Sequence, residues 1–174
     1  MKLKTLVCAA ALTIVGAAAQ AEDFTQNFAL TPNAATAGSY SGGWGHTHTV
    51  AGSFTDTITF TGAAGGWVNG GLFTLALDNA SDIDFTAVSL NGQTFTLISS
   101  GAMGIAVLSP TSLAGPLVLT VTGIAAPSLA AGTAISASYA GTLNVTAVPE
   151  PQTLALLLAG LGTLGLVARH RSRR

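Results

Sequence analysis

The central part of the chain has no lysine and no arginine. All 6 basic residues lie near the two ends of the sequence, and they are Lys2, Lys4, Arg169, Arg171, Arg173 and Arg174. Residues 22–148 carry only acidic charges, namely Glu22, Asp23, Asp56, Asp78, Asp82 and Asp84, so their net charge is about −6 with neutral histidines. A surface of this charge repels phosphates, and nucleic acid is therefore excluded as a partner.

Cysteine is almost absent as well. The single one, Cys8, lies in the N-terminal segment, so residues 22–148 can neither form a disulfide nor use a thiol as a nucleophile. The same residues have no lysine, no arginine to hold an oxyanion, no Gly-x-Ser-x-Gly motif, and no glutamate away from their ends to complete a glycosidase pair. We therefore predict no catalytic residue, no cofactor and no enzymatic activity.

Residues 1–21 have the three regions of a secretory signal peptide. Lys2 and Lys4 give the positive start, an apolar stretch follows at Leu6–Ala19, and Ala19-Gln20-Ala21 is a small-residue cleavage motif. A permanent N-terminal membrane anchor is the alternative, but the apolar stretch is short and ends in small residues. The sequence thus predicts export, with cleavage after Ala21.

Residues 22–147 are predicted to form one exported all-β domain. Short runs of Thr, Val, Ile, Leu and Phe alternate with clusters of Gly, Asn, Pro and Ser, and the charged residues of a helix surface are missing. The expected strands are Asp23–Leu30, Val50–Thr61, Gly66–Leu77, the hairpin Asp84–Ser99, Ile105–Leu108, Pro116–Thr122 and Thr133–Ala147, with a break allowed at Gly141. Gly42–Gly45 and Gly62–Gly66 are expected to be loops. About seven or eight antiparallel strands favour a β-sandwich or jelly-roll fold.

The hairpin carries the clearest turn signal of the chain. Asn91-Gly92 favours a two-residue type I′ turn between two alternating runs. The turn would pair Leu90 with Gln93, Val88 with Phe95 and Thr86 with Leu97. The apolar residues of these pairs, Val88, Leu90, Phe95 and Leu97, would then share one face.

The C-terminal segment, residues 148–174, has three parts. Pro149-Glu150-Pro151 is expected to be extended, because each proline fixes its own φ and disfavours helix in the residue before it. Leu154–Ala168 is an uncharged apolar run, which as a helix covers about 23 Å of an about 30 Å hydrocarbon core. With Gln152, Thr153 and the terminal arginines it predicts a transmembrane helix over 152–168, with the arginines in the cytoplasm. A buried C-terminal helix is the alternative, and it would normally carry a polar stripe.

This order of parts resembles the PEP-CTERM sorting signal of Gram-negative bacteria, also described as an ice-binding protein C-terminal domain. The resemblance rests on Pro149-Glu150-Pro151, on an apolar span with glycines, and on a stop signal formed by Arg169, Arg171, Arg173 and Arg174. It implies processing around Pro149-Glu150-Pro151 by an exosortase, a membrane-embedded thiol protease or transpeptidase. It also implies export across the inner membrane, anchoring there, and then a location at the cell surface or outside the cell.

A second resemblance involves Ser53–Thr61. Phe54, Asp56 and Phe60 resemble the motif of the FxDxF family of PEP-CTERM proteins, although Ile58 displaces the second aromatic to Phe60. The resemblance implies no activity. In a strand these residues would share an apolar face, opposite a row of threonines at 55, 57, 59 and 61. Because an unpaired buried carboxylate is costly, we expect Asp56 at a sheet edge or bonded to backbone amides, with calcium ligation as the alternative.

Two further segments carry metal-ligand chemistry, and neither is complete. Asp78, Asp82 and Asp84 are weak calcium candidates, but their spacing is not that of an EF-hand, and a polar turn is the simpler interpretation. His46 and His48 would share one strand face, yet two ligands do not close a site. We therefore expect the domain to fold without a metal.

Three functional hypotheses follow. The first is a non-enzymatic surface or extracellular-matrix protein, part of a biofilm or associated with exopolysaccharide. The second is a carbohydrate-binding module whose loop aromatics Tyr40, Trp44 and Trp67 contact exopolysaccharide. The third and weaker one is an ice-binding protein, which would need the threonine row to be repeated over several flat strands.

Overall fold

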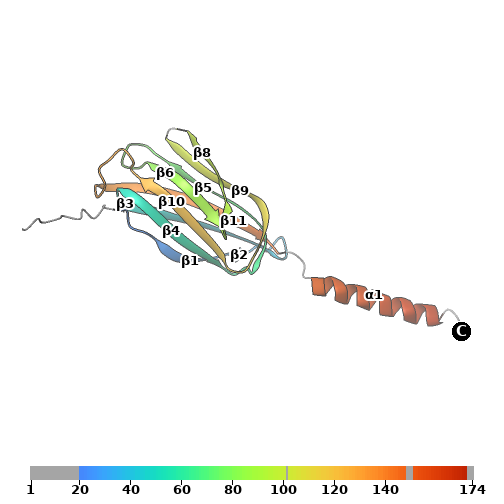
Figure 1. The fold of residues 1–174 in the computed structure, drawn as a ribbon. Helices are drawn as coiled ribbons and strands as arrows, with labels where there is room; N and C mark the ends of the chain where they lie inside the picture. The colour runs from blue at the N-terminus through green and yellow to red at the C-terminus, as the bar shows by residue number, and fades with distance from the viewer. Residues whose placement is uncertain (1–19, 101, 148–150, 172–174) are drawn as a thin grey trace, which may run out of the picture.

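The computed structural model describes residues 20–100, 102–147 and 151–171, which form a β-domain and a C-terminal helix (Figure 1). Sheet A has the strand order β1-β4-β10-β6-β7, and sheet B has the order β2-β3-β11-β5-β9-β8. The strands of sheet A are β1 (Thr25–Ala29), β4 (Gly52–Thr61), β6 (Ile83–Leu90), β7 (Gln93–Thr94) and β10 (Leu117–Ala125). The strands of sheet B are β2 (Thr31–Pro32), β3 (Ser39–Val50), β5 (Gly65–Leu75), β8 (Thr96–Ser100), β9 (Met103–Ala114) and β11 (Ala134–Thr146).

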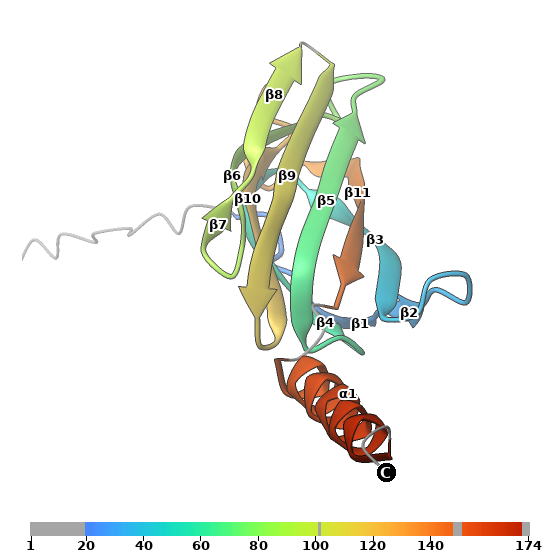
Figure 2. The ribbon, with the colours of Figure 1, turned by 90° about the vertical axis from the view of Figure 1, so that its right-hand side faces the viewer.

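The two sheets share one apolar core, and Figure 2 shows β5, β8 and β9 in front of β6 and β10. Alternation along each strand places the core residues: in β4, Phe54, Ile58 and Phe60 are buried, while the threonines between them are not. Strand β1 pairs with β4 in parallel, and the other pairings are antiparallel. The predicted all-β, mostly antiparallel body is confirmed, whereas its assignment as a sandwich or jelly roll stays a prediction.

The predicted loop at Gly42–Gly45 is wrong, because these residues lie within β3. A Cβ at Gly42 would lie 2.9 Å from the Leu30 side chain, and a Cβ at Gly45 would lie 3.1 Å from the carbonyl oxygen of Tyr139, so these glycines leave room for close neighbours. A Cβ at Gly141, on the neighbouring strand β11, would lie 2.5 Å from a ring atom of Trp44, so the missing side chain makes space for the buried indole. Strand β11 continues through Gly141, so the break that its sequence allowed is absent.

The predicted hairpin is correct at its turn and wrong at its far end. Asn91 and Gly92 have φ values of 48° and 81°, and Leu90 pairs with Gln93. The amide of Phe95 still donates to the carbonyl of Val88 at 2.9 Å. Beyond Phe95 the chain leaves sheet A and joins the edge of sheet B as β8, where Leu97 pairs with Ala106 instead of Thr86. Phe95 is buried at this crossing, whereas Leu97 is 38% exposed.

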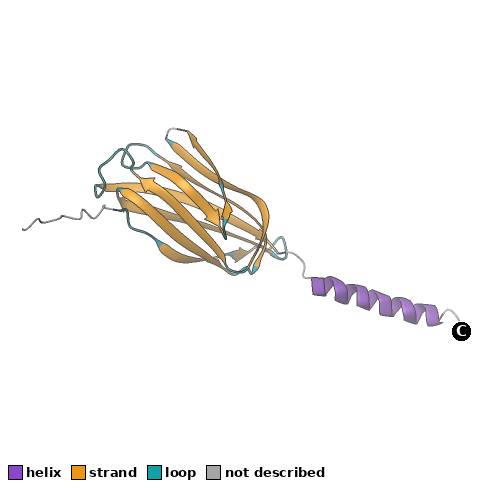
Figure 3. Ribbon diagram, viewed as in Figure 1, coloured by secondary structure: helices purple, strands orange, loops and turns teal. Residues whose placement is uncertain are grey.

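A single helix, α1 (Pro151–Arg171), follows the strands among the described residues (Figure 3). It confirms that the apolar run is helical. Within the described part of the chain, no helix has both the length and the apolar character needed to cross a membrane, so the predicted span over 152–168 is not supported. Pro151 opens the helix, a position that suits its fixed φ, so the extended conformation expected for it is wrong. Pro149 and Glu150 lie outside the described residues.

Candidate functional sites

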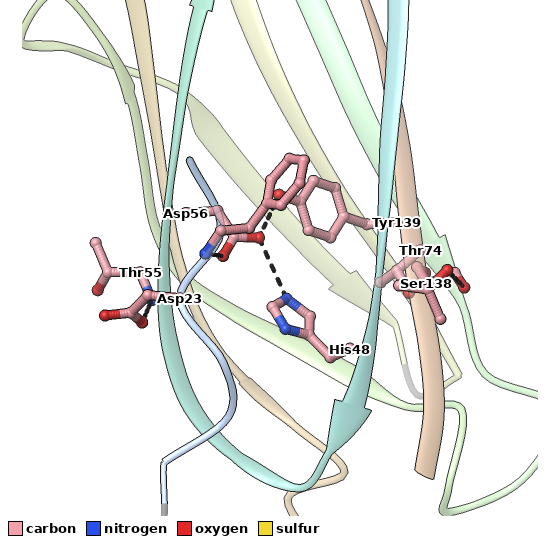
Figure 4. Close-up of polar contacts among 9 residues, drawn as sticks. Asp23, His48, Thr55, Asp56, Thr74, Ser138 and Tyr139 are labelled. Carbon is pink, nitrogen blue, oxygen red and sulfur yellow. Dashed lines mark hydrogen bonds and ion pairs between the residues drawn. The ribbon is translucent and has the colours of Figure 1, made fainter. Parts of the chain in front are cut away.

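A buried carboxylate links the two sheets. The Asp56 side chain, on β4 of sheet A, is fully buried, and its Oδ2 accepts a hydrogen bond of 2.6 Å from the hydroxyl of Tyr139 (Figure 4). Tyr139 lies on β11 of sheet B, so this bond crosses the core. The other oxygen, Oδ1, accepts a hydrogen bond of 3.0 Å from the amide of Phe24. The expected bond to a backbone amide is therefore present, while the sheet-edge alternative is excluded because β4 lies between β1 and β10.

His48 approaches the same carboxylate from β3 of sheet B. Its Nε2 lies 3.2 Å from Asp56 Oδ2, and its side chain is as fully buried as that of Asp56 (Figure 4). The ring packs against Phe54 with a centroid distance of 4.0 Å. Within the described part of the chain, neither ring nitrogen of His48 has a hydrogen-bond partner of acceptable geometry. The contact with Asp56 is thus close but does not satisfy the imidazole.

His46 completes the group from two residues upstream. It is half-buried, stacks on Phe24 with ring centroids 4.0 Å apart, and meets the His48 ring edge-on at 4.7 Å. Partial burial, followed by the proximity of His48, holds the pKa of His46 below its usual value. Burial, together with the hydrogen bond to Asp56, raises the pKa of Tyr139 well above its usual value, so Tyr139 remains a hydroxyl donor.

One ligand atom from each of His46, His48 and Asp56 lies within 4.8 Å of the others. Strands β3 and β4 are consecutive but belong to different sheets, so the chain turns a corner at Ala51 and Gly52. Gly52 has a φ of 147°, which a side chain rarely allows. The histidines face inward from one sheet and Asp56 faces inward from the other, so the corner brings them together. The sequence placed these residues in two separate weak sites and missed Tyr139.

The carboxylates of the acidic segment 78–84 do not come together as a cation site. Within the described residues, Asp78, Asp82 and Asp84 are not part of any group that could hold a metal ion. Asp78 Oδ1 instead accepts hydrogen bonds from the hydroxyl and amide of Ser81 and from the amide of Ala80. The hydroxyl bond is the main cause that lowers the pKa of Asp78. The polar-turn interpretation therefore describes this segment.

The three aromatic residues considered for carbohydrate binding do not lie together on loops. Trp44 is 4% exposed and packs edge-on against Phe60 in the core, so it is unavailable to a ligand. Tyr40 is half-buried in β3. Trp67, in contrast, is 55% exposed on β5, beside a shallow cavity of about 270 Å³ that is also lined by Asn69 and Asn144.

Threonines repeat across the outer face of sheet A. Strand pairing aligns one row of hydroxyl-bearing residues across β1, β4, β10, β6 and β7, namely Thr25, Thr57, Thr120, Ser89 and Thr94. The next row along β4 and β10 pairs Thr55 with Thr122. The threonines predicted along β4 are therefore one part of a larger array of hydroxyl groups that extends across the strands of sheet A.

The C-terminal segment follows strand β11 of sheet B in the sequence. The last described residue of the body, Ala147, donates a hydrogen bond of 2.7 Å to the carbonyl of Gly38. Along α1 the leucines 156, 157, 158, 161 and 164 are each more than half exposed. Arg169 and Arg171 belong to α1, whereas Arg173 and Arg174 lie outside the described residues.

Comparison with protein families identifies the C-terminal segment. Residues 147–174 match the family model described as the PEP-CTERM protein-sorting motif. No curated protein and no solved structure matches the chain. The resemblance to the sorting signal is confirmed on these residues, while the FxDxF subfamily is not.

Proposed function

From the PEP-CTERM sorting motif at residues 147–174, we infer that this protein is a non-enzymatic, exported cell-surface or extracellular-matrix protein processed by an exosortase. The motif is the observation that carries the proposal, since it implies export, anchoring before processing and then a surface location. We further propose that the β-domain acts in the extracellular matrix, as a biofilm component or in contact with exopolysaccharide.

The connection between body and tail supports processing at Pro149-Glu150-Pro151. The bonded body extends to Ala147, so one residue, Val148, separates it from the first proline. The five exposed leucines of α1 favour an apolar environment for the tail before processing. Cleavage near Pro149-Glu150-Pro151 would therefore release a complete β-domain.

The test compares the mature protein from exosortase-positive cells with that from cells lacking the enzyme. Trypsin is unsuitable, because the chain has no lysine or arginine between Lys4 and Arg169. Intact-mass measurement and chymotryptic peptides should show loss of the segment after Glu150 only when the exosortase is present. Replacement of both Pro149 and Pro151 by Ala should abolish this loss. Recovery of the full-length mass, or of chymotryptic peptides that continue past Glu150, from the surface pool of exosortase-positive cells would contradict the proposal.

A carbohydrate contact at Trp67 is the second candidate function. An exposed indole can cover the apolar face of a sugar ring, while Asn69 and Asn144 beside it offer amides to sugar hydroxyls. Pull-down with purified exopolysaccharide should lose most of its yield on Trp67→Ala. The matched control is Phe73→Ala on the same strand, because Phe73 is 58% exposed and does not line that cavity. Equal yields from the two variants would contradict a contact at Trp67.

Ice binding is the weaker alternative, and the hydroxyl array of sheet A is the observation in its favour. Thr120 is the central member of the aligned row, between Thr57 and Ser89. A Thr120→Tyr variant, with its bulky ring in the middle of this row, should lose thermal hysteresis if the array binds ice. Absence of thermal hysteresis in the unmodified protein would end this hypothesis.

A further inference from the structure

We propose that His46, His48 and Asp56 form a binding site for a divalent first-row transition metal ion, with zinc as the ion to be tested. The donor set is the first argument. Two imidazoles and one carboxylate are the ligands that zinc and neighbouring transition metals take in sites with an open position. Calcium prefers six to eight oxygen ligands, and this group offers a single carboxylate.

The distances are the second argument. Ligands bound at about 2.0–2.1 Å around a tetrahedral zinc are separated from one another by about 3.3–3.4 Å. The contact between His48 Nε2 and Asp56 Oδ2 measures 3.2 Å, so this pair already has the required separation. The whole group lies within 4.8 Å, so a modest rotation of the half-buried His46 ring would close the set.

The unsatisfied imidazole is the third argument. His48 is 1% exposed, and among the described residues neither of its ring nitrogens makes a hydrogen bond. Such buried groups are rare in folded proteins, because each loses its hydration without compensation. A metal bound to Nε2 would satisfy the nitrogen that points towards Asp56.

The surroundings provide the outer shell of a metal site. Asp56 is held by the Tyr139 hydroxyl at one oxygen and by the Phe24 amide at the other. Hydrogen bonds of this kind fix the orientation of a metal-binding carboxylate. Phe24 also stacks on His46, and it precedes β1, an edge strand that pairs only with β4 in the described structure. Local opening of this edge gives an ion a route to the buried ligands.

The experiment titrates zinc and calcium by calorimetry into the full chain, purified in mild detergent, treated with EDTA and dialysed. We expect about one zinc per chain and no calcium binding at the same site. Loss of outer-shell partners typically weakens metal binding about 10–100-fold, so removal of a direct ligand by His46→Ala should weaken it at least tenfold. His170→Ala, which removes the third histidine of the chain, is the matched control and should leave the affinity unchanged.

A second readout separates a metal site from a purely structural contact between His48 and Asp56. Cobalt bound by nitrogen and oxygen ligands gives visible absorption. Zinc should displace the cobalt and remove this absorption, and His46→Ala should abolish it. Asp56→Asn should behave likewise where circular dichroism shows that it folds. The proposal fails if zinc does not bind, if His46→Ala and His170→Ala bind zinc equally, or if calcium occupies the site in preference to zinc. In those cases the contact between His48 and Asp56 is only a part of the buried core. The outcome does not depend on exosortase processing.

Discussion

The hydroxyl of Tyr139 should contribute measurably to stability, and Tyr139→Phe removes it with little change of shape. The hydroxyl donates a 2.6 Å hydrogen bond to Asp56 Oδ2, a length typical of charge-assisted bonds. Hydrogen bonds to charged groups contribute about 1.5–3 kcal/mol. Without this donor, Oδ2 keeps only the 3.2 Å contact with His48. We therefore expect a loss of about 2 kcal/mol in the free energy of unfolding.

Thermal unfolding of the full chain, followed by circular dichroism in EDTA, measures this loss. Unfolding entropy of about 2.1 cal/mol/K per residue, applied to about 126 residues of the β-domain, gives about 0.26 kcal/mol/K. A loss of about 2 kcal/mol then lowers Tm by about 7–8 °C. The control is Tyr40→Phe, the same change at the other tyrosine of the chain, which should shift stability by less than about 0.5 kcal/mol. Equal shifts for the two variants would refute the role assigned to the Tyr139 hydroxyl.

Three further predictions test the turn, the glycine packing and the acidic loop. Gly92→Val should destabilise the domain by about 1 kcal/mol or more through backbone strain alone, because a Cβ there meets no atom within 4 Å while φ is 81°; an unchanged denaturation midpoint would contradict the turn. Gly141→Ala should cost about 1–3 kcal/mol, because its Cβ would lie 2.5 Å from the Trp44 ring, and a melt indistinguishable from that of the parent would contradict this packing. Ser81→Ala should raise the pKa of Asp78 towards its usual 3.8, as an NMR titration would show. The lowered pKa in the folded state stabilises the domain above pH 3.8, and this contribution is lost as the pH falls through the folded pKa, so the variant should have less of it. An unchanged pKa would assign the shift to other groups.

Alternation and turn chemistry were sufficient to predict β1, β4, β5, β6, β10 and β11 approximately, whereas β3 was not among the predicted strands. Strand β4 has an inward apolar row and an outward threonine row, and Asn91-Gly92 forms the expected turn. These features depend on neighbours in the sequence. The exchange of the chain from sheet A to sheet B after Phe95 depends on which strand edge is open, and no local pattern encodes that.

Glycine caused the main error in the strands. Gly42–Gly45 has the composition of a loop, but in β3 its small residues accommodate close approach to β11. The need for small residues becomes clear only from the contact between Trp44 and Gly141, which lies almost 100 residues later in the chain. A short stretch of sequence does not contain both residues, so their contact could not be predicted from it.

The buried polar group was partly visible in the sequence. Asp56 interrupts an apolar row, and His46 and His48 share the inward face of the preceding strand. Each signal was found separately, since period two gives the face of a strand but not which strand it opposes. Tyr139 carried no signal of its own, because a tyrosine among alternating residues resembles any other core aromatic.

The position of β11 determines how the domain would respond to mechanical force. This strand leads to the C-terminal tail, and it lies between β3 and β5 in the interior of sheet B. Antiparallel hydrogen bonds run perpendicular to their strands, so a pull on Thr146 along β11 loads both ladders in shear. The bonds on the two sides must then yield together rather than one after another. A domain held through its C-terminus is thereby attached at a strand that is hydrogen-bonded on both sides.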